Sequence, residues 1–519
     1  MKGQSARVIT PPRCWPGLCR APAPLSMKRI GAHAAVILAL AGAAHAADVS
    51  PGDIMVTKAP SPAAATAPAA CGSLWDFIVT SCPLSWYGIT VYGVVDAGVT
   101  WQSHGTPFNR TYVAGEEYLI SRNSNRALWG LAPNALSQSN IGIKGNKEFA
   151  PGWSFVFDLQ AGFDPYSLRL ADGPGSVAQN AGVPLISQNS NADSSRAGQF
   201  YNSVGYVGVS SPTYGTLTVF RQNSLTLDGI AAYDPMGGSY AFSVIGYQGI
   251  ACGAGDTEDC RFSTSVKYRV NIGQLRAAAL WQFGGYSQNN GSNGAYQFQV
   301  GGDIPNLANG MLSFDAIYSH VTDAVAIALA GNPVGPAGNP LPPWLPQVLT
   351  ATISDDTSVM LLARYTNGPV KLYAGYEWIQ FAPPSDPQTS FTDIAGDPLC
   401  LGCAAINNTN INNTAFSVHR RILQIFWTGA KYAVTDNIDL TGAYYHYNQD
   451  SFAAVGCSTA AKSTCSGTLD AVSFVVDWRF AAKFDVYAGF MYSRVDNGLA
   501  NGFLNHSTID PTVGGRFRF

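Results

Sequence analysis

Apolar and polar residues alternate with a period of two through most of the chain. From Trp153 to Phe163, apolar side chains stand at every second position, and mostly polar residues lie between them. The same alternation runs through 261–270, 273–285 and 468–480. Because a period of two places successive side chains on opposite faces of a strand, the pattern predicts half-buried strands rather than helices.

Sixteen segments of this kind follow one another to the last residue, which predicts an all-β chain. We place the strands at about 85–101, 138–148, 152–164, 199–210, 214–222, 261–270, 273–285, 294–302, 309–320, 357–366, 369–382, 419–433, 437–447, 468–480, 483–494 and 511–519. Seven short turns alternate with eight mostly longer loops, so both ends of the strand region fall on the side of the short turns.

The even number of strands, their length and the difference between turns and loops are typical of an antiparallel up-and-down transmembrane β-barrel. Such a barrel closes because every backbone polar group must be paired where no water is available. Alternation alone also fits a soluble β-sandwich or a repeat protein with apolar residues inside. Aromatic residues at strand ends, such as Trp101 and Tyr492, loops rich in Gly, Asn and Ser, and a final strand that stops on Phe519 favour the membrane.

The composition agrees with this fold class. Of 519 residues, 12% are charged, against about 25% in ordinary soluble domains. A mean hydropathy of +0.04 excludes a helical membrane protein. An aromatic content of 12% excludes intrinsic disorder, and 30 basic against 33 acidic residues make a nucleic-acid partner unexpected.

The N-terminal segment predicts export. A positive n-region at 27–29, an apolar run at Ala34–Ala41 and an A-x-A cleavage site at 44–46 form a complete signal peptide. Met27 is therefore the expected start and 1–26 an upstream extension, although one long positive region is the alternative. The resulting division is 1–46 for extension and signal peptide, 47–84 for a Pro/Ala-rich linker with a cysteine segment, and 85–519 for the barrel.

Eight cysteines follow the signal peptide in four close pairs, which predicts small disulfide-closed loops in an oxidising compartment. The pairs are Cys71/Cys82, Cys252/Cys260, Cys400/Cys403 and Cys457/Cys465. The alternative is metal binding, since Cys400 and Cys403 form a CxxC. A zinc site would need a second such pair or histidines at ligand spacing, and neither is evident, so we expect no metal and no cofactor.

Several strands resemble those of the Gram-negative porins. Trp86–Gly98 is similar to the opening strand of that family, Ser139–Gly145 and Gly152–Phe157 to its second and third strands, and Gly215–Gln222 to the strand that leads into its constriction loop. The resemblance covers about 71–519 and points to the alpha-proteobacterial porins found in root-nodule and related bacteria.

The resemblance implies an outer-membrane protein of a Gram-negative bacterium, a homotrimer of sixteen-stranded barrels surrounded by lipid and lipopolysaccharide. It implies that Phe517 and Phe519 are presented to the outer-membrane assembly machinery, and that Cys71 and Cys82 close a periplasmic or plug-like hairpin. It also implies that the third long loop, about 223–260, folds into the lumen.

The acidic residues of that loop are the candidate constriction residues. Some porins carry a Pro-Glu-Phe-Gly turn at the tip of the loop, but this chain has Tyr233-Asp-Pro-Met-Gly237 in a comparable place. The candidates therefore rest on position. They are Asp228, Asp234, Asp256, Glu258 and Asp259.

A pore needs no catalyst, because its selectivity comes from its width and from charged side chains that face each other at the narrowest point. The period of two places nine basic side chains in the lumen, where they avoid a cost of about 2–4 kcal/mol each on the lipid side. They are Lys144, Arg261, Lys267, Arg269, Arg276, Arg364, Lys371, Arg516 and Arg518. For each of them, a salt bridge within the wall is the alternative to a role in selectivity.

Arg221 is ambiguous, because the pattern of its strand puts it among apolar neighbours. Either the strand bulges there, or the residue faces a trimer contact.

We therefore expect a water-filled channel for passive diffusion of small hydrophilic solutes and ions, and no enzyme. The alternatives are a substrate-specific channel of the same architecture, a barrel enzyme such as a phospholipase, and an adhesin or structural barrel. No HExxH, GxSxG or Walker A motif is present, and the histidines after the signal peptide are scattered.

Overall fold

The computed structural model describes 71–104, 127–168, 170, 200–245, 261–284, 292–330, 348–382, 385, 420–452, 465–500 and 505–519, without the side chains of 74, 323–330 and 348–354. These residues belong to one compact unit, His45–Phe519. The predicted signal peptide and most of the predicted linker lie outside the described residues.

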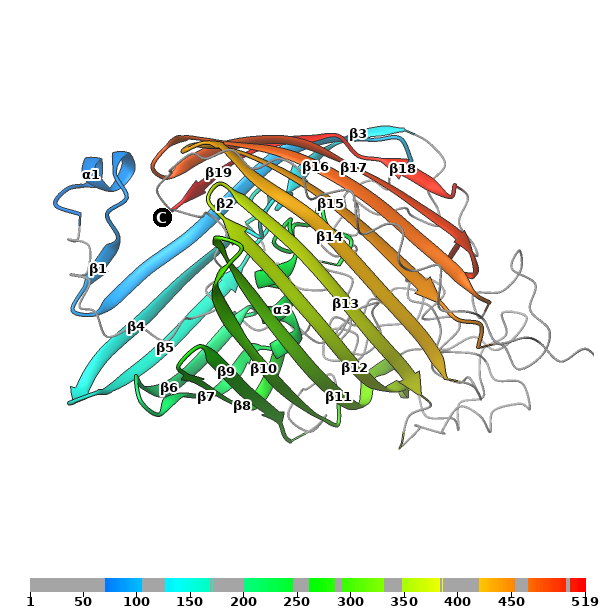
Figure 1. Ribbon diagram of the computed structural model, residues 1–519, viewed down its shortest axis with the longest axis horizontal. Helices are drawn as coiled ribbons and strands as arrows, with labels where there is room; N and C mark the ends of the chain where they lie inside the picture. The colour runs from blue at the N-terminus through cyan, green and yellow to red at the C-terminus, as the bar shows by residue number, and fades with distance from the viewer. Residues whose placement is uncertain are drawn as a thin grey trace, which may run out of the picture. The chain divides into compact units, whose positions relative to one another are not determined.

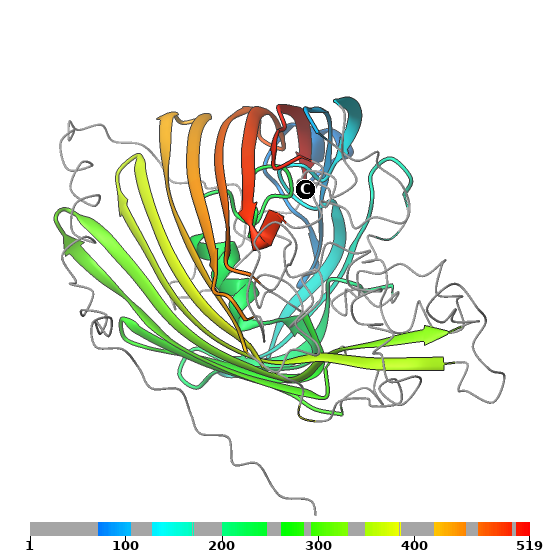
Figure 2. The same ribbon diagram turned by 90° about the vertical axis from the view of Figure 1, so that its right-hand side faces the viewer.

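The described part of the chain is almost entirely sheet (Figures 1 and 2). The strands are β1 (Leu84–Trp86), β2 (Ile89–Gln102), β3 (Leu128–Pro133), β4 (Asn140–Ala150), β5 (Trp153–Gly162), β6 (Val204–Ser211), β7 (Gly215–Asn223), β8 (Arg261–Ile272), β9 (Leu275–Gln282), β10 (Gly294–Leu307), β11 (Gly310–Ala330), β12 (Val348–Asn367), β13 (Val370–Ala382), β14 (Arg421–Thr435), β15 (Ile438–Gln449), β16 (Gly467–Ala481), β17 (Phe484–Asn497), β18 (Ser507–Ile509) and β19 (Thr512–Arg518). The helices are α1 (Leu74–Val79), α3 (Leu225–Tyr233) and the 3-10 turn η7 (Gly498–Ala500). Within the described residues, no helix is both long and apolar enough to cross a membrane.

The sheet closes on itself, because its last strand pairs with its first long one. β19 pairs antiparallel with β2, from Thr512 opposite Thr100 to Arg518 opposite Val94. Along the rest of the wall consecutive strands pair antiparallel, except that β4 pairs with β2 and β19 with β17, so the paired strands bond their backbone groups to one another. If β1 is left aside and β3/β4 and β18/β19 each count as one strand, the described wall has sixteen strands, as predicted.

The two faces of the wall differ as the alternation predicts. Large apolar side chains such as Val99, Phe155 and Phe298 are 47, 44 and 51% exposed. Residues next to them in sequence, such as Gln297, are buried on the other face. The apolar face is therefore the outer one, and the polar face lines the inside of the barrel.

The seven short turns are present, and they lie between consecutive strands from β4 to β17. The turn between β8 and β9 is typical: only Gly273 and Gln274 connect the strands, and Gly273 has a φ of +63°. A side chain rarely adopts that conformation, so glycine suits this turn.

Three predicted loops contain strands, and the shortest of these strands, β18, lies in the predicted loop 495–510, where it pairs with β17. β3 lies in the predicted loop 102–137 and pairs with the C-terminal half of β2, while β4 pairs with the N-terminal half of β2. The wall strand is broken between them, because Asp96 on β2 accepts hydrogen bonds from the backbone N–H groups of Leu136 (3.0 Å) and Ser137 (2.6 Å) and holds 134–139 out of the ladder.

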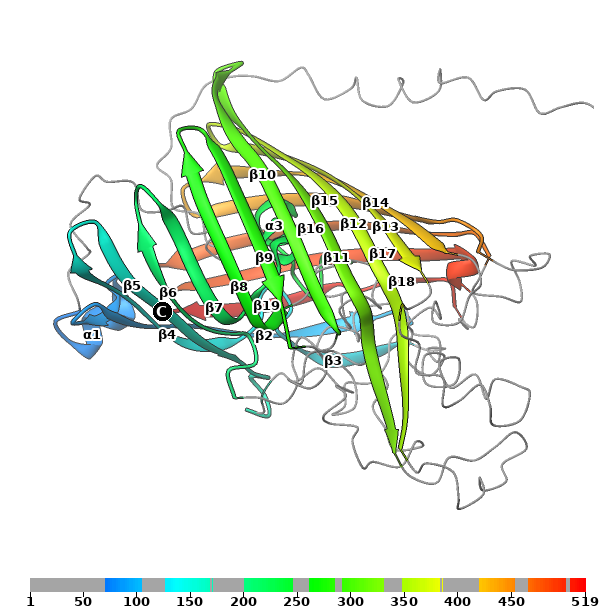
Figure 3. The same cartoon turned by 90° about the horizontal axis from the view of Figure 1, so that it is seen from below.

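Another correction concerns the loop predicted at 321–356. β11 continues to Ala330 and β12 starts at Val348, and the two pair with each other beyond the ends of their neighbours (Figure 3). The sequence there no longer alternates strictly, which is why the pattern did not predict a strand. A bulge between Val321 and Ala324 marks the point where the hairpin leaves the wall.

Candidate functional site

α3 begins directly after β7, and its start is encoded locally. Ser224 is the N-cap, and its hydroxyl accepts a hydrogen bond from the N–H of Leu227 at 2.9 Å. Asp228 lies in the first turn, where a negative charge suits the helix dipole. The helix ends at Tyr233, and Pro235 follows its C-cap residue.

α3 packs on the inner face of the wall. The side chain of Gln297 on β10 accepts a hydrogen bond from the N–H of Leu225 at 2.6 Å, and Trp427 on β14 donates through Nε1 to the carbonyl of Tyr233 at 3.1 Å. At Gly229 a Cβ atom would come within 2.8 Å of Ile317 on β11. The missing side chain therefore lets the helix lie close to the wall.

The segment after α3 continues across the inside of the barrel. Tyr445 on β15 donates to a carboxylate oxygen of Asp234 at 2.6 Å, and Ser473 on β16 donates to the carbonyl of Phe242 at 2.5 Å. The ring of Phe242 meets that of Tyr487 on β17 edge to face, with 6.1 Å between centroids. Residues 225–245 are thus bound to strands on several sides of the wall.

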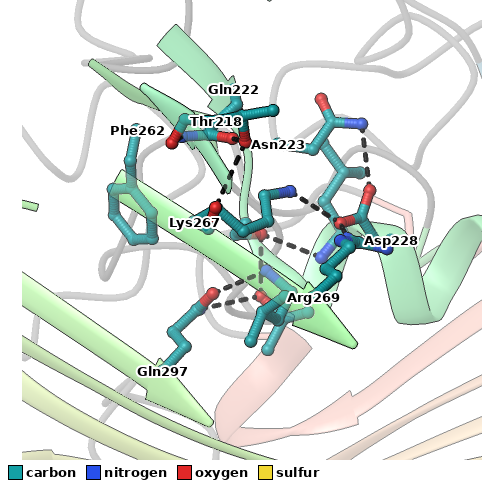
Figure 4. A network of polar contacts seen from close by, with 12 residues as sticks. Thr218, Gln222, Asn223, Asp228, Phe262, Lys267, Arg269 and Gln297 are labelled. Atoms are coloured by element: carbon teal, nitrogen blue, oxygen red, sulfur yellow. Dashed lines mark hydrogen bonds and ion pairs between the residues drawn. The ribbon is translucent and has the colours of Figure 1, made fainter. Parts of the chain in front are cut away.

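An acid on α3 faces two bases on β8 (Figure 4). Asp228 accepts from Nζ of Lys267 at 2.9 Å and from the guanidinium of Arg269. Burial by itself raises the pKa of Asp228, but the positive charges of Arg269 and Lys267 outweigh it and hold the pKa below its usual value. Asp228 is therefore a carboxylate at neutral pH.

A second charged group lies at the other end of α3. Arg276 on β9 contacts Asp315 on β11 at 2.8 Å and Asp303 on β10 at 3.1 Å. It also donates to the hydroxyl of Tyr233 at 2.7 Å, and that hydroxyl donates to Asp315 at 2.5 Å. The C-terminal turn of α3 is thereby tied to an acidic stretch of wall.

Arg364 on β12 completes this group. Its guanidinium donates to the carbonyl of Ala232 at 3.2 Å and lies 5.7 Å from the ring centroid of Tyr233. Bases from β8, β9 and β12 thus surround one short helix. Among the described residues there is no group of three or more His, Cys, Asp or Glu that could hold a metal ion.

Comparison with known proteins identifies the family. The sequence pattern of the Gram-negative porins matches residues 32–498 of this chain. The chain belongs to the Gram-negative porin family. An outer membrane porin protein from Bordetella pertussis is 22% identical over 200 residues, which is 38% of this chain and 42% of that protein. The chain thus matches less than half the length of that relative.

A solved porin structure agrees on the fold. An anion-selective porin from Comamonas acidovorans superposes with a TM-score of 0.51 and 15% identity over 83% of this chain and 99% of its own. OmpT, an outer membrane protein of Vibrio cholerae, superposes with a TM-score of 0.49 and 13% identity over 84% of this chain and 99% of its own. The likeness to the Comamonas porin shows the fold alone, a closed porin barrel, and family membership places this porin in the outer membrane.

The structure of the porin brings some predicted basic residues together and separates others. Lys267, Arg269, Arg276 and Arg364 surround α3, as described above. Lys144 lies elsewhere, 4.7 Å from the ring centroid of Tyr92. Of the remaining predicted lumen bases, Arg261 stands on β8 opposite Asn223 and Lys371 on β13 opposite Thr366. The last two are Arg516 and Arg518.

Arg516 and Arg518 belong to a cluster near the C-terminus. Both contact Asp485 on β17, at 2.8 and 2.7 Å, and Arg516 also contacts Asp477 on β16 at 3.1 Å. These ion pairs join the last strand to its neighbours. For this pair of arginines the contacts match the alternative of a salt bridge within the wall.

The predicted acids divide in a similar way. Asp228 faces bases, whereas Asp234 accepts from Tyr445 and from the N–H groups of Met236 (3.2 Å) and Gly238 (2.8 Å), and so holds the turn after α3. Burial raises the pKa of Asp234. Three further candidates lie outside the described residues, and they are Asp256, Glu258 and Asp259.

Arg221 shows which of its two interpretations holds. β7 bulges between Phe220 and Gln222, and this turns Arg221 to a buried position. Its Nη2 donates to the carbonyl of Asn202 at 2.6 Å and its Nη1 to the hydroxyl of Ser263 at 2.9 Å. The bulge explains the broken alternation.

One predicted disulfide is complete in the structure. Cys71 is bonded to Cys82, with 5.2 Å between their Cα atoms. Cys465 is also disulfide-bonded, but its predicted partner lies outside the described residues. The other predicted cysteines also lie outside the described residues, and they are Cys252, Cys260, Cys400, Cys403 and Cys457.

The residues missed by the sequence analysis are the other partners of α3, of the bases around it and of the loop that follows it. Asp315 and Asp303 bind Arg276. Trp427 and Tyr445 bind the loop. Gly229 allows α3 to approach the wall. The alternation of 309–320 placed Asp315 on the polar face, so that signal was available. Nothing local marked Trp427 or Tyr445, since their contacts with the loop join residues about 200 positions apart.

Proposed function

We propose that the porin is a water-filled channel for passive diffusion of small hydrophilic solutes and ions, narrowed by the third long loop, about 223–260. The observation that carries the proposal is the binding of 225–245 to the inner face of several strands, from β10 to β17. A segment held in this way reduces the open cross-section of the barrel. Family membership supports a channel rather than an enzyme.

The charged side chains around α3 are the proposed selectivity residues. Lys267 and Arg269 stand opposite Asp228, so ions that pass α3 meet both signs of charge. With Arg276 and Arg364 included, four bases face the three acids Asp228, Asp303 and Asp315 among the described residues. We therefore expect a weak preference for anions, the selectivity that the name of the Comamonas porin gives for that protein.

We further propose a homotrimer, embedded in lipid and lipopolysaccharide, whose Phe517 and Phe519 are read by the outer-membrane assembly machinery. Membership in the porin family supports these proposals.

The experiment that tests the channel is single-channel recording of the purified, folded protein in a planar bilayer under a salt gradient. We expect stepwise openings and a reversal potential whose sign indicates a preference for anions. Folded, heat-modifiable protein that conducts no ions would contradict the diffusion channel.

Gly229→Leu tests the role of the loop. The larger side chain cannot keep the contact with β11, so α3 moves off the wall and the unit conductance changes. Gly273→Asn, at the exposed turn between β8 and β9, is the matched control, because asparagine tolerates the positive φ there. An unchanged conductance in Gly229→Leu would show that α3 does not limit the pore.

A further inference from the structure

A disulfide-closed hairpin precedes the first long strand. Cys71 is bonded to Cys82, and α1 lies within the closed loop. The hydroxyl of Ser73 caps the helix by accepting from the N–H of Asp76 at 3.1 Å. We call residues 71–88 the rim module, because they stand at the end of the barrel where the C-terminus lies (Figure 1).

The rim module continues the wall of the barrel. The backbone of Phe519 exchanges two hydrogen bonds with Gly93 on β2, of 2.9 and 3.0 Å, and β19 ends there. β1 then pairs antiparallel with the remaining end of β2, with Ser85 opposite Thr90. β1 therefore occupies the edge of β2 that β19 leaves free.

The helix of the module lies on the outer face of the wall. The ring of Phe77 on α1 meets those of Phe517 and Phe519 edge to face, at 6.1 and 5.9 Å between centroids. Arg516, the neighbour of Phe517, contacts Asp485 on the inner face, so Phe517 points outward. α1 is thus docked on the outward-facing side chains of the last strand.

Lys483, in the turn between β16 and β17, clamps the helix in place. Its Nζ lies 3.6 Å from the ring centroid of Phe77 and donates to the carbonyl of Cys82 at 2.9 Å. One basic side chain of the wall therefore holds both the helix and the end of the disulfide loop.

The rest of the module exposes aromatic surface with almost no charge. Trp75 is 69% exposed, Trp86 54% and Tyr87 92%. Asp76 is the one charged residue between 71 and 88. Trp and Tyr gather where a membrane meets water, because one part of each ring system is apolar and another forms hydrogen bonds.

This surface is continuous with an outward row of aromatic rings. Phe480 is followed by Phe484, Phe517 and Phe519, with 6.1, 4.8 and 5.3 Å between successive centroids, and Phe77 extends the row onto α1. An outward aromatic row at the end of a transmembrane barrel lies at the level of the lipid headgroups.

We propose that the rim module is a membrane-interface anchor: Trp75, Trp86 and Tyr87 insert into the headgroup layer of the periplasmic leaflet, and the occupant of this surface is phospholipid. The disulfide, β1 and Lys483 hold the module in place before it meets lipid, so little conformational entropy remains to be lost on binding. The proposal is independent of the conductance of the pore.

Photo-crosslinking of the full, folded porin tests this assignment. Trp75 is replaced by p-benzoylphenylalanine, and the protein is reconstituted in vesicles of phosphatidylethanolamine and phosphatidylglycerol, irradiated and analysed by mass spectrometry. The matched control carries the same label at Gln274, an exposed residue in a turn at the same end of the barrel. A second labelled position, Tyr87, serves if the protein labelled at 75 does not fold.

A mass increase of one phospholipid is expected at positions 75 and 87, several-fold above that at position 274. Replacing both Cys71 and Cys82 by serine lowers the yield of the adduct at position 75, since α1 is then no longer held on the wall. A covalent dimer of two chains would overturn the proposal and assign the surface to contact between subunits. Equal adducts at positions 75 and 274, or none, would overturn it in favour of exposure to water.

Discussion

At the scale of single residues, the most consequential contact is that of Asp228 with Lys267 and Arg269. Asp228→Asn leaves the two bases without a facing carboxylate, and the reversal potential under a salt gradient is expected to move toward anions. Lys267→Met is expected to move it toward cations. Asp436→Asn, at the exposed turn between β14 and β15, is the control. Equal shifts in the Asp228 and Asp436 variants would indicate a long-range effect of net charge only.

The same residue gives a prediction for pH. Its pKa lies below the ordinary value of about 4, because Arg269 and Lys267 outweigh the effect of burial. A carboxylate with a lowered pKa keeps its negative charge, and the stability that this charge contributes, above its ordinary pKa. It loses both only as the pH falls through the lowered value. The difference in reversal potential between wild type and Asp228→Asn should therefore persist from about pH 7 to about pH 4 and shrink only below that range. A difference that vanished near pH 6 would contradict this assignment.

At the scale of elements, the break between β3 and β4 depends on Asp96. Its carboxylate accepts from the N–H groups of Leu136 and Ser137 and, at 2.5 Å, from the hydroxyl of Tyr487 on β17. Hydrogen bonds to charged groups contribute about 1.5–3 kcal/mol each without being additive, so Asp96→Ala is expected to lower the free energy of unfolding by about 3–5 kcal/mol. Urea unfolding in vesicles measures this loss.

The matched control for Asp96→Ala is Asp436→Ala, because Asp436 is exposed at a turn and its substitution is expected to cost about 0.5 kcal/mol or less. If the two variants unfold alike, the Asp96 carboxylate does not hold 134–139.

At the scale of the whole molecule, closure joins distant parts of the chain. β19 meets β2 after more than 400 residues, and the ion pairs of Arg516 and Arg518 with Asp485 lie beside this seam. The proposed trimer belongs to this scale too. The porin extracted in mild detergent should show the mass of three chains, and its conductance should rise in groups of three steps. A mass of one chain in every mild detergent would contradict the trimer.

The alternation of apolar and polar residues by itself determined the fold class, the sixteen strands of the wall and the seven short turns. It could do so because the period of two is a local property, and lipid outside and water inside impose it on every strand. The start of α3 is also encoded locally, since Ser224 and Asp228 suit a helix N-terminus, although the alternation predicted only a loop there. The pair Cys71/Cys82 was readable for the same reason, at a separation of 11 residues.

Only the tertiary structure decided which charges meet. Asp228 and Asp234 looked equivalent in sequence, yet one faces two bases while the other accepts from Tyr445, 211 residues away. The break at 134–139 and the docking of α1 on Phe517 and Phe519 depend equally on closure, since Tyr487 and the last strand reach β2 only when the barrel is complete. Partners of this kind are set by the radius, tilt and register of the closed sheet. Those quantities belong to the whole wall, and no single segment encodes them.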